Sequence, residues 1–228
     1  MAYGAQSSGA YNDSGDGSGS GTGRADRMLQ FHSEFGDFAT TIQYQYRQLS
    51  PSDIQSNYRY GTGASIIYKG WKDIGLQLGA AFSYAKFSEI TEGMRSIGID
   101  GSDQSYIMGF SFKRDNYLIN ANLSYSKNHM NDNLGIYFDS VEAEIYLHYD
   151  LGNTIRIAGG LNWLLPRDSD YHGDFRISKE ILSLQYTFGK HTFDDLIYLE
   201  VALPHGRTAS GEKSETSIAL GLRYLFGW

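Results

Sequence analysis

The side chains that could carry out chemistry are few and widely spaced. The chain contains no cysteine, which excludes disulfides, thiol nucleophiles and Cys-ligated metals together. None of its histidines has a partner at a spacing that indicates nucleophilic catalysis, and no His-Glu-x-x-His metal motif occurs. The Gly-rich run from Gly15 to Gly23 does not open a helix after a strand, as a nucleotide site requires. The histidines are His32, His129, His148, His172, His191 and His205. The sequence therefore predicts no enzyme activity, no bound metal and no cofactor.

The overall charge and hydropathy exclude two further classes. A formal net charge of -7, with Lys and Arg scattered along the chain, argues against nucleic-acid binding, which requires clustered cations. No apolar run approaches the roughly 18 residues of a membrane helix. The mean hydropathy of -0.40 still permits a membrane-spanning barrel, because each barrel strand alternates apolar with polar residues.

Two segments differ sharply in composition. Residues 1–24 are rich in Gly and Ser and contain few large apolar side chains to bury, so they are predicted to form a loop. Residues 25–228 contain nearly all of the aromatic and β-branched residues, with only 3 prolines in the whole chain. This second segment is predicted to be a single all-β unit.

A period of two in hydrophobicity runs through residues 25–228 and predicts about eleven strands. In the stretch 38–47, for example, Phe38, Ile42 and Tyr44 alternate with polar residues. Apolar residues recur in the same way in the remaining strands, which are expected near 27–33, 58–69, 74–84, 105–113, 117–126, 141–149, 155–163, 182–188, 197–203 and 217–226.

The connections between these strands alternate in length. Short turns are expected at 34–37, 69–73, 113–116, 150–153 and near 189–190, and long polar loops at 48–57, 87–104, 127–137, 166–174 and 204–215. A regular alternation places the turns at one end and the loops at the other, which is typical of a transmembrane antiparallel β-barrel. Aromatic residues near the strand ends are interpreted as interfacial girdles, although aromatics are enriched in any strand.

Several segments, in their order along the chain, resemble the general, nonspecific, trimeric porins of Gram-negative bacteria. The segments 23–31, 35–38 and 42–45 look like the family's strand, turn and strand after its constriction loop. The segment 60–68 is similar to the next upward strand, and the segment 219–226 to the C-terminal strand. The family ends in Phe, whereas Gly227 and Trp228 follow Phe226 here. Trp228 keeps the parity of the apolar face and is a candidate for the terminal aromatic that the barrel assembly machinery reads.

The resemblance implies an outer-membrane barrel of sixteen strands that works as a homotrimer in lipid. The family's constriction loop lies between its fifth and sixth strands, so residues 1–24 would match the end of that loop. Sixteen minus five leaves eleven strands, the number that periodicity also predicts. The chain is therefore expected to be the C-terminal part of such a barrel. No signal peptide is visible after Met1, which is expected of a mature or partial chain.

Parity and the resemblance together predict the pore lining. The predicted pore-lining residues are His32, Arg47, Arg59, Lys113, Glu142, Glu144, Arg156 and Arg223. Asp13 and Asp16 are assigned to the constriction loop, although that loop's acidic and aromatic motif is not recognisable in residues 1–24. His32 stands where the family usually carries Arg, which would weaken the transverse field at neutral pH.

The predicted function is passive diffusion of small hydrophilic solutes and ions through a water-filled pore. One alternative is an outer-membrane barrel with a structural, binding or insertion-substrate role and no open pore. An outer-membrane phospholipase is a third class, which an assay of lipid hydrolysis would distinguish.

Overall fold

A computed structural model describes residues 28–46, 58–131, 134, 136–167, 175–188 and 196–223. Predicted features at residues 1–27, including Asp13 and Asp16, lie outside this part, as do Arg47 and the C-terminal Trp228. The strands are β1 (Met28–Phe35), β2 (Phe38–Tyr46), β3 (Tyr58–Trp71), β4 (Leu76–Phe87), β5 (Ser102–Arg114), β6 (Tyr117–Asn131), β7 (Tyr137–Leu151), β8 (Ile155–Pro166), β9 (Ile177–Thr187), β10 (Leu196–Pro204) and β11 (Ser217–Arg223).

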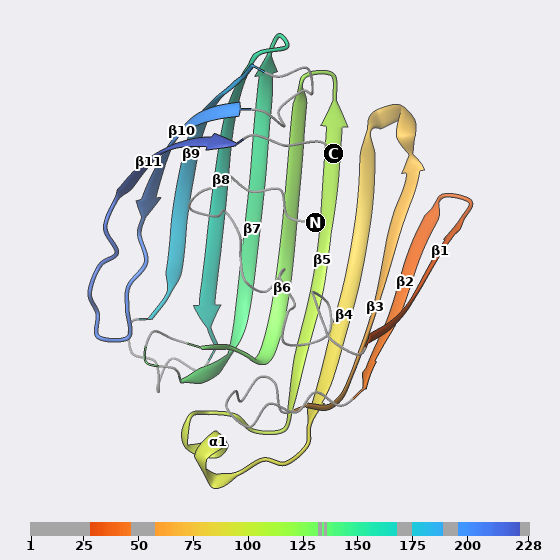
Figure 1. Cartoon of the computed structure of the whole chain (residues 1–228), viewed down its shortest axis with the longest axis vertical. Coiled ribbons are helices and arrows are strands. Elements are labelled where there is room, and N and C mark those ends of the chain that lie inside the picture. Colours follow the sequence, from red (N-terminus) through yellow and green to blue (C-terminus); the bar gives the residue numbers. More distant parts are fainter. Residues whose placement is uncertain are drawn as a thin grey trace.

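These strands form one sheet in which each strand pairs with its neighbours in sequence, from β1 to β11, and all of these pairings are antiparallel. Figure 1 shows them as a single curved wall with β1 and β2 on one side and β9, β10 and β11 on the other. The predicted number of strands and the predicted all-β class are confirmed. No helix in the described residues is long and apolar enough to cross a membrane.

Short turns gather at one end of the wall. The β1–β2 and β5–β6 hairpins close with two residues each, and left-handed backbone at Gly36 (φ 57°) and Asp115 (φ 49°) suits the twist of such turns. The 3-10 helix η3 (Lys72–Ile74) and left-handed Gly75 close β3–β4 at the same end, drawn at the top of Figure 1.

The long-loop end departs from the sequence prediction in two places. The predicted loop 127–137 is mostly strand, because β6 continues to Asn131 and β7 begins at Tyr137. The predicted loop 87–104 is shortened to 88–101 and contains the helix α1 (Glu92–Ser96), which Thr91 caps by accepting a hydrogen bond from the Met94 amide at 3.2 Å. Where a strand continues beyond its apolar part, its residues are polar and show no alternation in hydrophobicity, so the sequence gives no sign of these extensions.

The α1 loop has its own small apolar core. Its buried members are Tyr58, Ala85, Phe87, Met94, Ile99 and Tyr137, contributed by β3, β4, β7 and the loop itself. The Tyr137 amide donates to the Ile97 carbonyl at 2.7 Å, and the Asn128 side chain donates to the Ser102 carbonyl at 3.0 Å. This loop is therefore packed against the ends of several strands.

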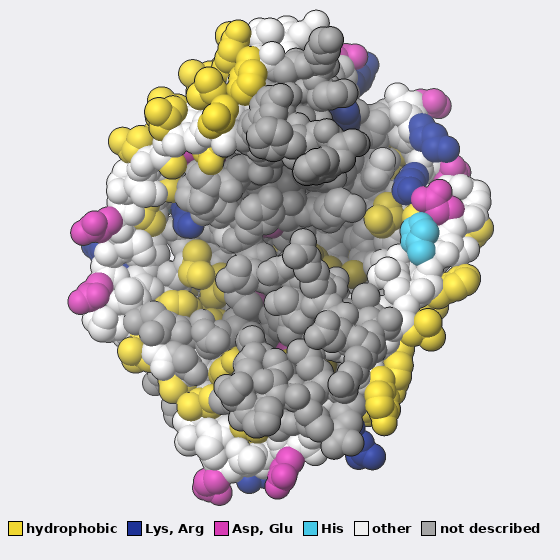
Figure 2. Space-filling view, viewed as in Figure 1, with side chains coloured by type: hydrophobic (Ala, Val, Ile, Leu, Met, Phe, Trp, Pro, Cys, Tyr) yellow, Lys and Arg dark blue, Asp and Glu magenta, His cyan; other side chains and the backbone are white. Residues whose placement is uncertain are grey.

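The two faces of the wall reverse the pattern of a soluble protein. Large apolar side chains on one face are exposed, among them Ile42, Met108, Leu147 and Leu184. On the other face many of the buried side chains are polar, for example Gln45, Ser126 and Glu142. Figure 2 shows hydrophobic side chains along the outer margins of the molecule at its upper left and lower right. An apolar outer face and a polar inner face are the alternation that a lipid-embedded barrel requires.

Aromatic rings form two belts on the apolar face. The short-turn belt includes Phe35, Phe38, Tyr68, Trp71, Phe112, Tyr117 and Tyr149, with ring centroids 5.0–6.5 Å apart in its neighbouring pairs. The long-loop belt includes Tyr44, Tyr60, Tyr84, Tyr106 and Tyr125, with centroids 6.1–6.4 Å apart in its neighbouring pairs.

The separation of the belts fits a bilayer. On β6, Tyr117 and Tyr125 are eight residues apart (125 minus 117). At about 3.4 Å per residue and a tilt of about 40°, these belts stand about 20 Å apart along the barrel axis. An outer-membrane barrel presents an apolar band about 25 Å tall between its aromatic girdles, so the spacing agrees with the predicted interfacial interpretation.

Candidate pore lining

Strand register joins the inner face into one continuous surface. Residues directly opposite each other in an antiparallel pair lie on the same face of the sheet. The inner face can be followed from strand to strand through these pairs. His32 on β1 pairs with Thr41 on β2, Thr41 pairs with Ser65 on β3, and the later pairings carry the same face on to β11. The predicted lining positions 32, 113, 142, 144, 156 and 223 all fall on this one face of the backbone register.

Two carboxylates on β7 are buried in this face. Glu142 is fully buried and accepts a hydrogen bond from Ser124 Oγ at 2.6 Å and a second, very short one from Ser140 Oγ. Glu144 is 3% exposed and accepts from Asn122 Nδ2 at 3.2 Å. Their donors come from β6 and from β7 itself, so neighbouring strands hold both carboxylates in place.

A charged cluster occupies the inner face near the short turns. Arg156 on β8 makes a bidentate contact with Asp150 on β7, with Nε–Oδ1 at 2.6 Å and Nη2–Oδ2 at 3.0 Å. His148 Nε2 lies 3.8 Å from the same carboxylate. The fork geometry fixes the guanidinium plane, so Arg156 presents its charge in a defined direction. Sequence reasoning identified Arg156 but missed its partner, because Asp150 lay within a predicted turn.

His32 belongs to a second polar group, near the β1–β2 hairpin. Its Nδ1 lies 3.0 Å from Thr41 Oγ1, and its Nε2 lies 3.8 Å from Glu34. Lys69 of β3 donates to the same Glu34 carboxylate at 2.9 Å. His32 and Glu34 are largely exposed and Lys69 is half-buried, so this group can contact solvent in the predicted lumen.

Lys113 and Arg223 occupy inner positions near the short-turn end. Lys113 is exposed and pairs in register with Leu118, which in turn pairs with His148. Arg223 pairs with Leu196 in the backbone register. These assignments to a pore lining stay predictions.

Arg59 is affected by an irregularity that the sequence did not reveal. Tyr58 pairs with Phe87 and Tyr60 with Lys86, so β3 advances two residues while β4 advances one. This β-bulge interrupts the parity by which Arg59 was assigned. Tyr58 occupies the inner position at this point, where its hydroxyl donates to Asp103 in a very short hydrogen bond. Neither residue was predicted, because the inward position of Tyr58 depends on this bulge and Asp103 lay within the predicted loop 87–104.

The inner face is hollowed next to the acidic positions. A cavity of about 650 Å³ extends along β1 to β7, and its polar lining includes Gln43, Ser83, Ser105, Asn122 and Glu144. Serine, glutamine and asparagine side chains can exchange hydrogen bonds with water and with hydroxylated solutes. No group of three or more His, Cys, Asp or Glu in the described ranges could hold a metal ion.

Comparisons with known proteins identify the fold. No protein-family description and no curated protein match the chain. Among solved structures, OmpF of Salmonella typhi, in a complex with daunomycin, superposes with a TM-score of 0.74 at 18% identity, covering 89% of this chain and 62% of that one. An anion-selective porin from Comamonas acidovorans superposes with a TM-score of 0.60 at 13% identity, covering 87% and 59%. OmpT of Vibrio cholerae superposes with a TM-score of 0.55 at 11% identity, covering 84% and 59%.

The chain thus spans less than two thirds of the length of each of these porins. Its eleven described antiparallel strands superpose on part of their barrels. The chain has the porin fold, and its eleven described strands form one antiparallel sheet that matches about 60% of the length of these porins.

Proposed function

We propose that the chain forms most of the wall of an outer-membrane pore through which small hydrophilic solutes and ions diffuse passively. One observation carries this proposal: an apolar outer face and a polar, charged inner face continue without reversal across all eleven strands. Selectivity in such a pore comes from the width of the lumen and from the charges on its wall, with no covalent step. Buried Glu142 and Glu144 and the Arg156–Asp150 pair would supply these charges.

Completion of the wall requires further strands. Because eleven is an odd number, β1 and β11 run in the same direction, and joining them directly would create a parallel seam. An added segment with an odd number of strands gives two antiparallel seams, and the sixteen-stranded barrel implies five (16 minus 11). Each backbone group left unpaired in lipid would cost several kcal/mol, so the edges need such a segment.

The same proposal specifies the surroundings of the protein. The apolar face and its two aromatic belts contact outer-membrane lipid, and the barrel assembly machinery inserts the chain. A trimer form of OmpT of Vibrio cholerae superposes with a TM-score of 0.54, which supports a homotrimer for the completed barrel.

A second candidate function is a barrel with a filled lumen that serves a structural or binding role. The complete burial of Glu142 and its bonding to two serines favour this alternative, since these groups are withdrawn from solvent.

Planar-bilayer recordings separate the two candidates. The chain should be refolded together with the five N-terminal strands of a solved porin, and each polypeptide should also be refolded alone. We expect open, weakly ion-selective conductance from the pair. A permanently closed barrel would favour the filled-lumen alternative. A lone chain that closes as a monomer with ordinary antiparallel pairing would contradict the requirement for added strands.

A further inference from the structure

A row of uncharged residues crosses the inner face from β2 to β7. Strand register places its members, called the polar row below, directly opposite one another in turn: Gln43, Gly63, Ser83, Ser105, Ser126 and Ser140. The hydroxyls of Ser105 and Ser126 lie 3.0 Å apart, and Gln43 Oε1 accepts from Gln30 Nε2 at 3.3 Å. Neighbouring side chains therefore hold the row on both sides of its middle.

Ser83, in the middle of the polar row, is the exception. It is 1% exposed, and its Oγ has no hydrogen-bond partner among the described residues. Of the two residues opposite it, Gly63 has no side chain and Ser105 bonds to Ser126. A buried hydroxyl without a partner costs free energy, so we expect a group that occupies the adjoining cavity to supply one.

The Gln43 side chain approaches the same point. Its Nε2 lies 3.1 Å from the position that a Cβ on Gly63 would occupy, so the amide extends over β3 into the space that this glycine leaves. Cβ positions directly opposite each other in a sheet are about 5 Å apart, and Ser83 is the residue opposite Gly63. An amide donor and a hydroxyl, which both donates and accepts, therefore face one small volume.

The cavity of about 650 Å³ at this point has a floor of small residues, which are Gly63, Gly79, Ala81 and Gly109. Ile107, opposite Ala81, adds an apolar patch. Asn122 lines the same cavity, and its Oδ1 also has no hydrogen-bond partner within the described part of the chain. The volume falls within the range of small-molecule sites, in which a mostly apolar surface carries a few placed polar groups.

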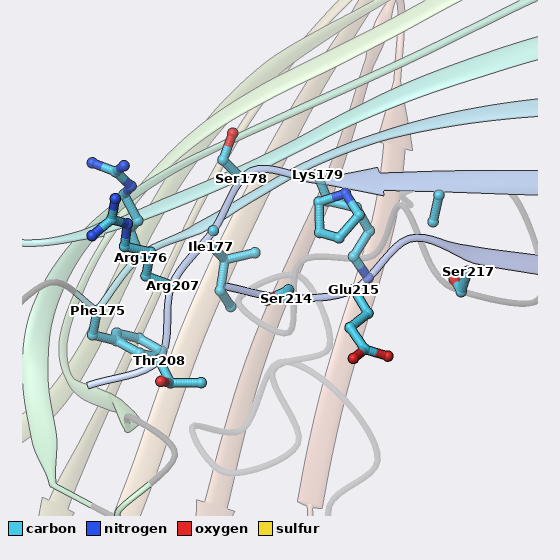
Figure 3. Close-up of a pocket in the computed structure, with 13 residues that line it drawn as sticks. Phe175, Arg176, Ile177, Ser178, Lys179, Arg207, Thr208, Ser214, Glu215 and Ser217 are labelled. Carbon is cyan, nitrogen blue, oxygen red and sulfur yellow. The ribbon is translucent and has the colours of Figure 1, made fainter. Parts of the chain in front are cut away.

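The lining is nearly free of charge. Among the described residues that line this cavity, Glu144 is the only charged one, and it already accepts from Asn122 Nδ2 at 3.2 Å. Charged side chains gather instead at a smaller pocket of about 280 Å³ beside β9 and β10, where Figure 3 shows Arg176, Arg207 and Glu215 on neighbouring segments. The larger cavity therefore favours an uncharged ligand.

We propose that this cavity is a binding subsite for a neutral, polyhydroxylated solute such as a sugar alcohol or a small sugar. Ser83 Oγ and Gln43 Nε2 bond to its hydroxyls, and Asn122 Oδ1 accepts from a further hydroxyl. The C–H groups of the solute pack against Ile107 and the small residues of the floor. This inference rests on the proposed function and deepens it, because it names a class of solute that the wall of the pore holds.

Saturation-transfer NMR on the full chain refolded in detergent tests the proposal. Sorbitol, gluconate and N-methylglucamine are the probes, because they are six-carbon chains of similar size that are neutral, anionic and cationic. We expect sorbitol to bind more tightly than either charged probe. Ser83→Ala should weaken sorbitol binding about 2-fold to 10-fold, the value of one hydrogen bond.

Ser183→Ala is the matched control. Ser183 is likewise buried on the inner face, but it lies on β9, outside the cavity, and its Oγ accepts from Gln185 Nε2 at 3.3 Å. Sorbitol binding should be unchanged in this variant. Heat-modified gel mobility reports folding, and Gln43→Ala, which should also weaken sorbitol binding, is the second test variant if Ser83→Ala does not fold.

Several outcomes would overturn the proposal. Equal binding of sorbitol to the wild type and to Ser83→Ala would do so, as would equal losses in Ser83→Ala and Ser183→Ala. Tighter binding of N-methylglucamine would assign the cavity to cations, and tighter binding of gluconate would assign it to anions. A lower urea midpoint of unfolding for Ser83→Ala would also count against it, because the hydroxyl would then have a partner within the protein.

The subsite and the pore fail separately. A permanently closed barrel that still binds sorbitol through Ser83 would contradict the proposed function and leave the subsite intact. An open pore whose sorbitol binding does not depend on Ser83 would contradict the subsite alone.

Discussion

Substitution of Ala121 by Arg should strongly destabilise the inserted protein. Ala121 lies on the outer face of β6, where it pairs with Phe110 and Ile145, and it is four residues from Tyr117 and four from Tyr125. Four residues correspond to about 14 Å of strand, or about 10 Å along the axis at a tilt of about 40°. Ala121 therefore stands at the midplane of the apolar band.

Arginine at the midplane of a lipid-facing strand costs about 2–4 kcal/mol. Because 1.4 kcal/mol is a factor of ten, Ala121→Arg should lower the folding equilibrium constant by roughly 30-fold to 700-fold. Alanine is small, so little of this cost comes from lost packing. Asn122→Arg is the matched control, since its neighbouring inner position faces Glu144, whose Oε2 accepts from Asn122 Nδ2 at 3.2 Å.

Urea titrations of folding into phospholipid vesicles measure the difference, with intrinsic tryptophan fluorescence as the signal. The midpoint for Ala121→Arg should fall well below that of the wild type, and the midpoint for Asn122→Arg should stay close to it. Equal shifts for the two variants would refute the assignment of the outer and inner faces.

Three further predictions concern the lumen, the α1 loop and one turn. Glu144→Gln should lower the ratio of cation to anion permeability, measured as a shift in reversal potential under a salt gradient, while Glu89→Gln in the exposed loop should leave it unchanged. Ile99→Ala removes a fully buried side chain from the α1-loop core and should destabilise that loop by about 2–5 kcal/mol, which limited proteolysis within residues 88–101 would detect. Gly75→Ala should destabilise more than Gly152→Ala in thermal unfolding, because both glycines have positive φ but only at Gly75 would the added Cβ also meet the Lys113 backbone carbonyl.

The strands were predictable because alternation is a local property. Phe38, Ile42 and Tyr44 on β2 carry it without reference to any other strand, and the structure places them all on the exposed face. The same holds for the two-residue hairpins, where Gly36 supplies the left-handed backbone that the turn requires. Local sequence therefore determined the elements, their number and which of their faces is apolar.

The details of the inner face depended on the partner strands. The bulge at Arg59 arises from the pairing of β3 with β4, and nothing in the segment 58–60 signals it. The Asp150–Arg156 pair likewise requires the β7–β8 register, which sets the two residues opposite each other. Parity alone identified Glu142 and Glu144 as inward residues, but their serine and asparagine donors come largely from the register with β6.

The edges of the sheet give a last, independent prediction. Apolar side chains on the edge strands are the most exposed, with Leu29 at 76% on β1 and Leu220 at 77% on β11, whereas Leu147 and Ile157 in the interior are at 50%. An interior side chain has a cross-strand neighbour on each side, and an edge side chain has one. The larger exposure of the apolar side chains on β1 and β11 therefore reflects the absence of a neighbouring strand on one side of each.

Hydrogen exchange can test whether that neighbour is supplied. In β1 and β11 about every second amide points away from the only paired strand, so these amides should exchange rapidly in the refolded chain alone. Addition of a five-stranded porin segment should slow them at both edges together, because one ribbon with an odd number of strands fills both seams. Protection at both edges before any addition would mean that the chain closes without help, and protection at one edge alone would mean that the added segment docks without completing the barrel.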